Sequence, residues 1–278
     1  MRAVVYNPAD SIVGKPGMGL AGRTALVTGA TGGIGEAFAR AFAAEGCNVV
    51  FNGLGDPAAI EALRADIGRG HDVEVIHYPA DNANPDHLEV MIAAAIKRFG
   101  AIDILVNNAV TRHYAPVEAF PVDKWELALA VNLSAAFHTI RLALPAMKAK
   151  NWGRIINMSS VHSTKVVRDR VDYMTTKHAI VGLTRAVALE TAETGVTCNA
   201  ISPGWVLTPH ADGQITRQMA AKGQTREQAI RELLDIRQPS RRPISPREVA
   251  ALGVYLCSDM AANITGAALP IDGGWAPS

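Results

Sequence analysis

The sequence predicts an α/β fold in which one doubly wound, seven-stranded parallel sheet is flanked by helices. Short runs of β-branched residues alternate along the chain with longer helical patterns, which is typical of parallel strands joined by crossover helices. A glycine-rich turn follows the first strand directly, and a long polar insertion interrupts the alternation late in the chain. Length alone would allow two domains for 278 residues, but the continuous series of elements predicts one.

The expected strands are short and apolar. They span residues 24–27, 48–51, 73–78, 102–106, 154–158, 196–201 and 268–271. Helices are predicted between them from apolar residues at helical spacing, as in Phe38, Ala41 and Phe42. Their ranges are 33–45, 85–99, 121–150, 171–193 and 246–256. The 121–150 helix should divide near Pro145, because proline interrupts helical hydrogen bonding. A further helix should follow Asp56, a typical N-cap with Pro57 at the first helical position.

Two segments stand apart from this series. Residues 1–20 are expected to form an N-terminal arm before a single domain at 21–278. Residues 205–243 are irregular and polar, with one helical stretch near 227–236. This segment is too long for an ordinary connection, and such insertions often cover an active site. We expect it to be a lid.

Composition narrows the classes of function. Lys plus Arg is 27 and Asp plus Glu is 26, so the basic excess of nucleic-acid or membrane-surface proteins is missing. Three scattered cysteines do not form a disulfide framework, and no metal-like cluster is evident. Neither an 18-residue apolar window nor a secretory signal is found. We expect a cytoplasmic protein without a metal.

The glycine-rich turn predicts a dinucleotide-binding, Rossmann-type domain. Residues 28–35 read TGATGGIG and lie between a buried strand and a helix. Gly29 permits the tight turn, Gly33 lets the backbone approach a pyrophosphate, and Gly35 lets the helix pack on the strand. The free N–H groups of the helix would then face the phosphates. The alternative is a glycine-rich turn without a ligand.

The end of the second strand bears on the choice of cofactor. NAD enzymes commonly place an acidic residue there to bind the ribose 2′-hydroxyl, whereas this chain has Asn52. No Lys or Arg lies in this loop or in the glycine turn, so a 2′-phosphate would lack a cationic partner. The sequence therefore favours NAD over NADP. Asp56 could supply the missing acid, but it is better explained as the helix cap.

A tyrosine and a lysine at helical spacing suggest proton-transfer chemistry. Tyr173 and Lys177 share one face of a predicted helix. A nearby ammonium lowers the pKa of a phenol and fits it to exchange a proton with an alcohol or carbonyl oxygen. Ser160, just past the fifth strand, could hydrogen-bond the same oxygen.

Taken together, these motifs resemble the short-chain dehydrogenase/reductase family over roughly residues 20–278. The matching pieces are the TGATGGIG turn, Asn107-Asn108-Ala109, Asn132, Ser160, Tyr173, Lys177, Pro203-Gly204, Thr208 and Asp272-Gly273-Gly274. The resemblance implies that Tyr173 is the general acid/base and that Ser160 orients the reacting oxygen. It also implies that Lys177 holds the nicotinamide ribose and that Asn132 supports a proton-relay water.

The same resemblance implies a cofactor site. Asp81 and Asn82 would face the adenine, Asn108 would lie along the cofactor, and Val206 with Thr208 would contact the carboxamide. The complete implied set is Gly29, Thr31, Gly33, Ile34, Gly35, Asn52, Asp81, Asn82, Asn108, Tyr173, Lys177, Pro203, Val206 and Thr208. One departure is Val110, which stands where the family usually has glycine.

Within the family, the chain most resembles the bacterial dehydrogenases of D-3-hydroxybutyrate. The segments that carry this likeness are 52–57, 177–184, 188–192, 195–201, 203–209 and 238–240. It implies reversible, NAD-dependent oxidation of a short 3-hydroxy acid to a keto acid, as in ketone-body metabolism, by a homotetramer. The substrate carboxylate would meet residues corresponding to Arg112, His162, Arg170, Trp205 and Gln214, with Trp275 shaping the pocket.

Two of these positions depart from the subgroup. Arg112 replaces a usual glutamine and Arg170 a usual lysine. Two guanidinium forks could hold one carboxylate well, or a larger or second anionic group. Alternatively, Asp169 or Asp172 pairs with Arg170, and Arg112 is a solvent-facing loop residue. The remaining alternatives are a family member for another anionic alcohol, such as a larger hydroxy acid, dicarboxylate or sulfonate, and a non-catalytic nucleotide sensor.

Overall fold

The computed structural model describes residues 18–276. Most of the expected arm at residues 1–20 therefore lies outside the described residues. Its last residues belong to the folded body. Leu20 is fully buried, its carbonyl accepts a hydrogen bond from the Cys47 thiol at 3.3 Å, and Met18 packs against the same apolar core.

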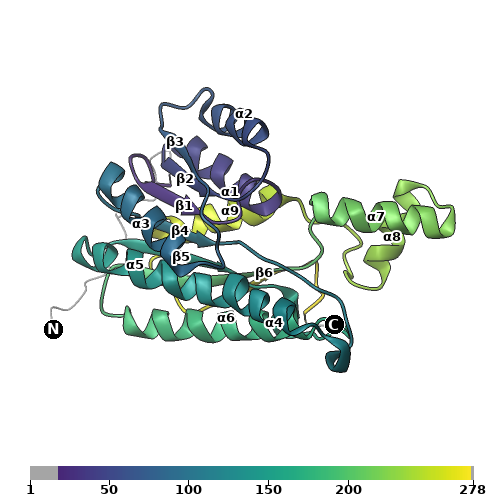
Figure 1. Cartoon of the computed structure of the whole chain (residues 1–278). Helices are drawn as coiled ribbons and strands as arrows, with labels where there is room; N and C mark the ends of the chain where they lie inside the picture. Colours follow the sequence, from purple (N-terminus) through teal and green to yellow (C-terminus); the bar gives the residue numbers. More distant parts are fainter. Residues whose placement is uncertain (1–17, 277–278) are drawn as a thin grey trace, which may run out of the picture.

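The predicted seven-stranded sheet is confirmed. All of its strands are parallel, in the order β3-β2-β1-β4-β5-β6-β7 (Figure 1). They are β1 (Thr24–Val27), β2 (Asn48–Asn52), β3 (Val75–Tyr78), β4 (Ile104–Asn107), β5 (Gly153–Met158), β6 (Val196–Pro203) and β7 (Ala268–Ile271). Because the chain winds outward from β1 in one direction and from β4 in the other, a crevice opens at the carboxyl ends of these two strands. Open α/β sheets bind their ligands at this switch point.

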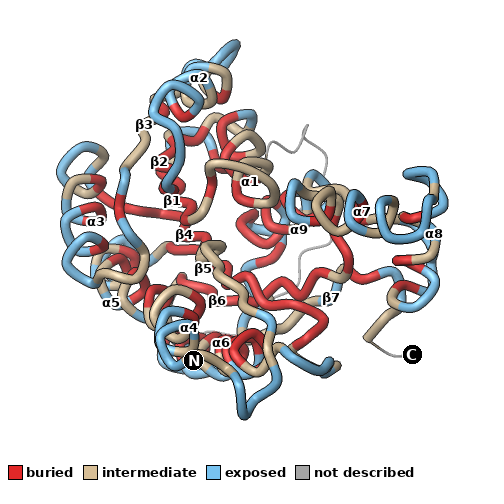
Figure 2. The backbone as a smooth tube through the Cα atoms, turned by 45° about the vertical axis from the view of Figure 1, so that its right-hand side comes forward, coloured by how far each residue is buried: buried red, intermediate tan, exposed pale blue. Residues whose placement is uncertain are grey.

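Helices cover both faces of the sheet. One layer holds α1 (Gly33–Ala44), α2 (Pro57–Gly68) and α9 (Pro246–Cys257), and the other holds α3 (Pro85–Phe99), α4 (Val122–Leu129), α5 (Ala135–Ala149) and α6 (Val171–Glu190) (Figure 1). Each layer has its own apolar core. Val27 and Phe51 point into the first and Leu26 and Val50 into the second, as alternation along a strand requires. The strands are accordingly the most deeply buried part of the fold (Figure 2).

Local signals explain several boundaries. The Asp56 carboxylate accepts a hydrogen bond from the Ala59 amide at 2.8 Å and Pro57 begins α2, which confirms the predicted cap. Such a cap contributes about 1 kcal/mol. Short 3₁₀ turns also occur at Val117–Ala119, Val161–Ser163 and Asp259–Ala261. Several predicted ends differ by two or three residues; for example, β3 begins at Val75 and α6 ends at Glu190.

The predicted division near Pro145 is wrong. Helix α5 runs through Pro145, and the interruption lies earlier, in the π-helical turn Ala130–Ser134. Proline removes only one helical hydrogen bond here, while Ile140, Ala143 and Met147 around it are buried in the core. Burial of this face outweighs the local defect.

The predicted irregular segment at 205–243 contains two helices rather than one: α7 (Pro209–Lys222) and α8 (Arg226–Asp235). The start and stop signals of α7 are present, since Thr208 caps it and Gly223 ends it in the left-handed conformation (φ 62°). The two helices project from the body beyond the edge of the main layers (Figure 1). They share a small apolar cluster with Trp205 that is separate from the two main cores.

One helical run is apolar enough to resemble a membrane span. Val122–Ala149 has a mean hydropathy of 1.5 over the relevant window. In the fold, however, α5 packs against α3, β4 and β5, and α4 packs against α6. This run is thus a covering layer of the α/β fold, and its apolar face serves the core.

Candidate active site

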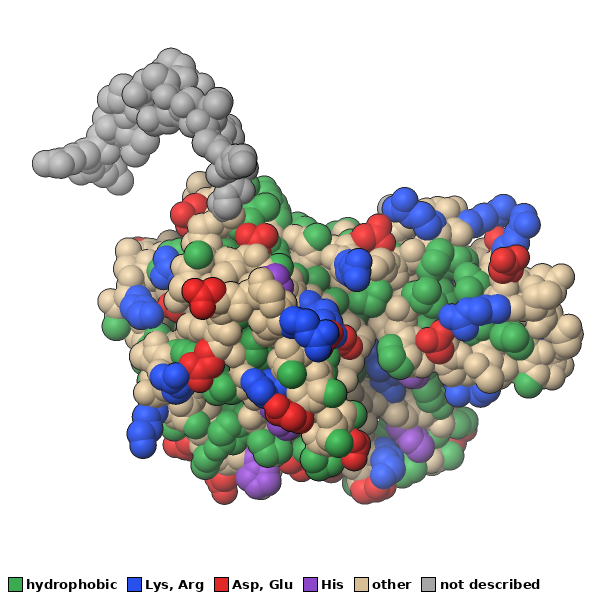
Figure 3. Space-filling model, turned by 90° about the horizontal axis from the view of Figure 1, so that it is seen from above, with side chains coloured by type: hydrophobic (Ala, Val, Ile, Leu, Met, Phe, Trp, Pro, Cys, Tyr) green, Lys and Arg blue, Asp and Glu red, His purple; other side chains and the backbone are tan. Residues whose placement is uncertain are grey.

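A cavity of about 1000 Å³ lies at the carboxyl ends of β1, β4, β5 and β6, between the body and α7. Its size suits a dinucleotide together with a small substrate, since ligand pockets commonly measure about 300–1000 Å³. Viewed from above, the molecule is hollowed between the body and the projecting helices, with basic and histidine side chains inside the hollow (Figure 3). The crevice at the switch point of the sheet is therefore the candidate active site.

The glycine turn forms one end of this cavity. Gly29 and Gly33 adopt positive φ of 62° and 59°, respectively. A Cβ on Gly35 would lie 2.4 Å from the Gly29 carbonyl oxygen, so only glycine lets α1 approach β1 this closely. Gly32 caps α1 without any side-chain hydrogen bond, and a Cβ there would meet open space. The first N–H groups of α1 are thus free of a side-chain cap, as a helix terminus that holds a pyrophosphate requires.

Replacement of Gly35 by alanine is expected to damage this turn. The added methyl group would also press on the Asn108 amide, 2.6 Å from the ideal Cβ position. Overpacking of this kind costs about 1–3 kcal/mol, so we expect Tm to fall by roughly 2–10 °C and NADH affinity to fall with it. Gly68→Ala at the end of α2, where the nearest atom is 3.5 Å away, is the matched control. Unchanged Tm and NADH affinity in Gly35→Ala would contradict this role of Gly35.

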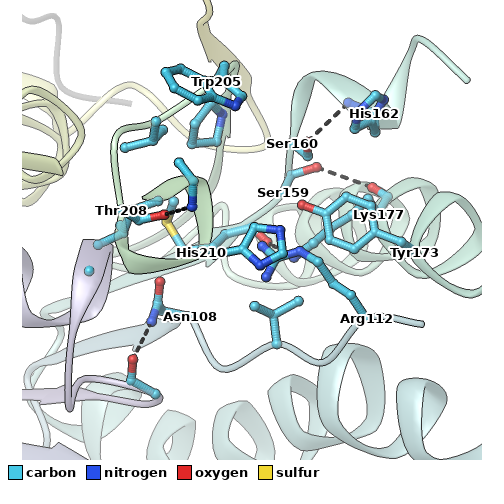
Figure 4. Close-up of a pocket in the computed structure, with 18 of the residues that line it drawn as sticks. Asn108, Arg112, Ser159, Ser160, His162, Tyr173, Lys177, Trp205, Thr208 and His210 are labelled. Atoms are coloured by element: carbon cyan, nitrogen blue, oxygen red, sulfur yellow. Dashed lines mark hydrogen bonds between the residues drawn. The ribbon is translucent and has the colours of Figure 1, made fainter. Parts of the chain in front are cut away.

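Asn108, directly after β4, holds the glycine turn in place. Its side-chain amide donates to the carbonyl oxygens of Thr28 at 3.0 Å and Gly29 at 2.8 Å (Figure 4). Thr208 reaches the turn from the other side, 3.5 Å from the ideal Cβ position of Gly33, and caps α7. Both residues line the cavity, as do Thr31, Ile34, Pro203 and Val206.

Asn52, at the end of β2, does not lie where the sequence-based expectation of a cofactor-binding residue would place it. This side chain is fully buried and does not line the described cavity. Its amide donates to the carbonyls of Tyr78 and Ala80, and its oxygen accepts from Gly29 and Asn82. Asn52 thus holds the glycine turn and the adjacent loop in place, and the residues that reach the cavity here are Gly53 and Leu54.

Asp81 and Asn82 lie on the cavity wall next to this end. The side-chain oxygen Oδ1 of Asn82 is buried without a hydrogen-bond partner among the described residues. A buried orphan acceptor calls for a donor, and an adenine amino group is one. The glycine turn, the uncapped α1 terminus and this orphan oxygen all fit a dinucleotide.

The predicted catalytic residues come together at the other end of the cavity. Ser160, Tyr173 and Lys177 are buried yet line it (Figure 4). The Lys177 ammonium lies 5.5 Å from the centre of the Tyr173 ring and donates to the Met158 carbonyl at 2.5 Å. The Ser160 side chain is near enough to Tyr173 to lower the pKa of its hydroxyl, and it accepts a hydrogen bond from the His162 amide at 3.2 Å.

Charge tunes the Tyr173 hydroxyl. Burial raises its pKa, but Arg112, then Lys177, the Ser160 hydrogen bond and Arg170 lower it more, to a net pKa of about 8. Burial lowers the pKa of Lys177 to about 8, partly opposed by Tyr173. Such a phenol is suited to exchange protons near neutral pH.

Arg112 and Arg170 both lie against Tyr173. Their guanidinium carbons are 5.1 and 4.3 Å, respectively, from the centre of the Tyr173 ring, and Arg170 also stacks on Tyr114 at 5.0 Å. Both arginines line the cavity, so the interpretation of Arg112 as a solvent-facing loop residue is wrong. Arg170 makes no ion pair with an acidic residue among residues 18–276.

Asn132 and Asp172 fix the loop that carries Arg112. The Asn132 side chain, in the π-helical turn, bonds both the amide and the carbonyl of Thr111, at 2.7 and 3.0 Å. The buried Asp172 carboxylate accepts from the His113 amide at 3.1 Å. The side chains of Asn132 and Asp172 thus anchor the residues before and after Arg112. Asn132 itself does not line the described cavity.

His162 is uncharged at neutral pH. Burial is the main cause that lowers its pKa to about 4. Its Nδ1 faces the Lys165 carbonyl at 3.2 Å and must donate to it, so Nε2 is left as an acceptor. The ring packs edge-on against Tyr173 and Trp275. The local positive charge therefore comes from arginines, and His162 adds a polar, neutral contact.

The segment 205–243 brings four of the predicted residues to the cavity: Trp205, Val206, Thr208 and Gln214. Trp205 donates its indole N–H to Gln214 Oε1 at 3.1 Å, and Gln214 Nε2 lies 3.2 Å from His210 Nε2. Tyr114, Arg168, His210 and Arg237 also line the cavity, and they were missed. His210 lies on α7 at the cavity (Figure 4), and burial, followed by the charges of Arg112 and Arg170, lowers its pKa to about 4.

No other chemistry competes with this arrangement among the described residues. They contain no cluster of His, Cys, Asp or Glu able to hold a metal ion. Cys47, Cys198 and Cys257 are buried, free thiols, and burial raises the pKa of each.

Comparisons with known proteins agree with this geometry. The sequence pattern of the family described as Enoyl-(Acyl carrier protein) reductase matches residues 29–276. D-beta-hydroxybutyrate dehydrogenases from Cupriavidus necator and Rhizobium meliloti are 48% and 46% identical, covering 92% and 91% of this chain and 98% of their own lengths. The crystal structure of L-sorbose reductase from Gluconobacter frateurii, complexed with NADPH and L-sorbose, is 28% identical, with a TM-score of 0.90 over 95% of this chain and 100% of that one. The chain therefore belongs to the oxidoreductases of the short-chain dehydrogenase/reductase family.

Proposed function

We propose that the protein catalyses the reversible, NAD-dependent oxidation of a short 3-hydroxy acid, with D-3-hydroxybutyrate, which yields acetoacetate, as its simplest substrate. The observation that carries this proposal is the placement of two arginines, Arg112 and Arg170, against the ring of the proton-exchanging Tyr173. An anionic group held by these guanidiniums lies only a few bonds from the oxygen that Tyr173 and Ser160 address. The identity of 48% to a D-beta-hydroxybutyrate dehydrogenase supports the same substrate class.

The protein's own residues carry the proton chemistry. The Tyr173 phenolate accepts the proton of the substrate hydroxyl, and Ser160, which lies beside Tyr173 and helps lower its pKa, orients that oxygen. Lys177, fixed by the Met158 carbonyl, stabilises the phenolate and would hold the nicotinamide ribose. Bound NAD supplies the acceptor for the hydride that leaves the carbinol carbon.

Arg112 and Arg170 anchor the carboxylate, with Gln214, Trp205 and His162 around it. The segment 205–243 acts as the lid and excludes water.

The preference for NAD rests on the adenosine end of the cavity. Among the described residues that line that end, around Thr31, Gly53, Leu54, Asp81 and Asn82, no Lys or Arg occurs and Asp81 is acidic. A 2′-phosphate would meet no cation and one carboxylate there. With Asp56 engaged as the α2 cap, the backbone of Gly53 and Leu54 and the side chain of Asp81 are the groups available to the ribose hydroxyls.

Initial rates of NADH formation test this proposal. We expect D-3-hydroxybutyrate to be oxidised with NAD, with kcat/KM at least about tenfold above that of the L enantiomer and above that with NADP. Tenfold corresponds to about 1.4 kcal/mol, less than one charge-assisted hydrogen bond. Absence of turnover with D-3-hydroxybutyrate and with other short 3-hydroxy acids, in protein that binds NADH, would refute the proposed activity.

We propose in addition that the enzyme works as a homotetramer in the cytoplasm, without nucleic-acid or membrane partners. Several large apolar side chains are exposed on the outer helices, among them Val122, Leu127, Phe137 and Leu189. Exposed apolar residues of this size favour burial against another copy of the chain. The near-neutral charge of +1 supports the absence of an anionic polymer as partner.

A further inference from the structure

We propose that the preferred substrate carries a second anionic group, bound by Arg237 on the lid side of the cavity, so that the enzyme favours a 3-hydroxy dicarboxylate over 3-hydroxybutyrate. This inference rests on the proposed function and names its substrate class more closely. It assigns Arg237 as a specificity-determining residue. The reaction is unchanged: the substrate hydroxyl is oxidised to a ketone, NAD is reduced to NADH, and one proton is released.

The charge inventory of the cavity is the first observation. Arg112, Arg170 and Arg237 line its substrate end, near Lys177, and are partly buried, whereas a fourth lining arginine, Arg168, is exposed to solvent. Among the described lining residues, Asp81 is the only acidic one, and it lies at the adenosine end. None of the three arginines has an ion-pair partner within residues 18–276. Desolvated cations without partners are unfavourable, and a single carboxylate neutralises only one of them.

Arg237 is built into the cavity wall rather than left in solvent. It follows α8, and one of its terminal nitrogens donates to Gln214 Oε1 at 3.4 Å. That oxygen already accepts the Trp205 indole at 3.1 Å, so this contact orients Arg237 but does not neutralise it. Burial, together with the charge of Arg170, lowers its pKa, while Tyr114 raises it. A guanidinium has five N–H donors, and most of those of Arg237 remain for a ligand.

Arg170, like Arg237, has N–H donors for which the described residues supply no hydrogen-bond acceptor. Its guanidinium contacts the rings of both Tyr114 and Tyr173, which restricts its position. Its Nε is buried and has no hydrogen-bond partner among the described residues. Arg112 lies on Tyr173 as well, so these two arginines are placed for the carboxylate nearest the reacting carbon. Arg237 comes from the lid and contacts the Gln214 side of the cavity, where the far end of a longer substrate would lie.

The nearby histidines do not supply the missing neutralisation. Arg112, Arg170 and Arg237 all help to lower the pKa of His162, and Arg112 and Arg170 that of His210, to about 4 in each case, with burial as the main cause. Two imidazoles beside the arginines thus stay neutral at pH 7 and add no charge. The region is a strongly positive pocket without a counter-ion among the described residues, which is the environment that a dianion prefers.

A matched set of substrates tests the inference in the wild-type enzyme. 3-Hydroxyglutarate is 3-hydroxybutyrate with the methyl group replaced by a second carboxymethyl arm, and its two arms are identical. 3-Hydroxy-5-methylhexanoate replaces that arm by an uncharged branched group of similar shape. We expect kcat/KM for 3-hydroxyglutarate to exceed that for D-3-hydroxybutyrate by about 10- to 100-fold, as a charge-assisted contact provides. The uncharged analogue should not share this gain.

Variants then assign the effect to Arg237. In Arg237→Gln, the ratio of kcat/KM for 3-hydroxyglutarate to that for D-3-hydroxybutyrate should fall about tenfold or more. Arg231→Gln, on the exposed part of α8 and not lining the cavity, should leave this ratio unchanged. An unchanged ratio in Arg237→Gln would remove Arg237 from the site.

The possible failures are distinguishable. Oxidation of D-3-hydroxybutyrate at a kcat/KM equal to or above that of 3-hydroxyglutarate overturns the second anionic group and leaves the proposed function intact. The second anionic group is also overturned if the uncharged analogue gains as much as the diacid, because shape rather than charge would then explain the preference. If no 3-hydroxy acid is oxidised by protein that binds NADH, the proposed function fails and this inference fails with it.

Discussion

Tyr173→Phe is expected to lower kcat for hydroxy-acid oxidation by about 10²- to 10⁴-fold, the usual contribution of a positioned acid or base. The substitution removes only the hydroxyl that exchanges the proton. The ring, which contacts Arg112 and Arg170, is kept, so the cavity and the substrate anchor should persist. Initial rates of NADH formation at saturating substrate measure the effect, and NADH fluorescence titration should show nearly unchanged cofactor affinity.

Tyr255→Phe is the matched control. Tyr255 is partly exposed on α9 and does not line the cavity, so loss of its hydroxyl should leave kcat within about twofold, as for most surface substitutions. Retained turnover in Tyr173→Phe would remove Tyr173 from the proposed proton transfer. Loss of NADH binding together with turnover would assign it a structural role instead.

Arg112→Gln is expected to shift the pH dependence of oxidation to higher pH. Oxidation requires the phenolate, and the pKa of Tyr173 is about 8, with Arg112 the largest cause that lowers it. In the wild type, kcat/KM should therefore rise with pH through about 8 and level off above. Without Arg112 the pKa rises, so the rising limb moves to higher pH. A Tyr173 pKa that is higher by about 1 lowers the phenolate fraction at pH 7 about tenfold.

The pH dependence of the reverse reaction, reduction of the keto acid, provides a second prediction for the same variant. Reduction of the keto acid needs the protonated phenol, so its falling limb should move to higher pH in the same variant. Because Arg112 also faces the carboxylate, KM should rise even at high pH, where the phenolate fraction is restored. Arg98→Gln on α3, an exposed arginine paired with Glu74, controls for general loss of positive charge. An unmoved pH profile in Arg112→Gln would show that its charge does not act on Tyr173.

The parts of the site that could be predicted from the sequence are those fixed by local geometry. Gly35 must be glycine because a Cβ there would collide with the Gly29 carbonyl oxygen in the same glycine-rich segment. Tyr173 and Lys177 lie close together because they are one helical turn apart on α6. The parallel sheet follows from alternating patterns of strand and helix. Such features depend on residues close in the chain or on a repeated topology, so one sequence is enough to reveal them.

Other features depend on contacts between distant residues. Asn52 stands where a ribose-binding acid is common, yet it is buried by contacts with Tyr78, Ala80 and Asn82, which come from the next strand and the loop after it. Arg237 gives no pattern in the sequence, because only the packing of α7 and α8 brings it to Gln214. The sequence places the helix interruption at Pro145 because proline is a local signal, but the structure has it near Ala130. How strongly each face of α5 is buried depends on tertiary packing, which the local sequence does not reveal.

The most direct test of the proposed activity follows the hydrogen on the carbinol carbon. The enzyme is mixed with NAD and D-3-hydroxybutyrate that carries deuterium at carbon 3, and the NADH and acetoacetate formed are quantified by mass spectrometry. We expect one deuterated NADH for each acetoacetate, with both products lost in Tyr173→Phe. NADH without deuterium, or acetoacetate formed without NADH, would contradict direct transfer from the hydroxy acid to the nicotinamide.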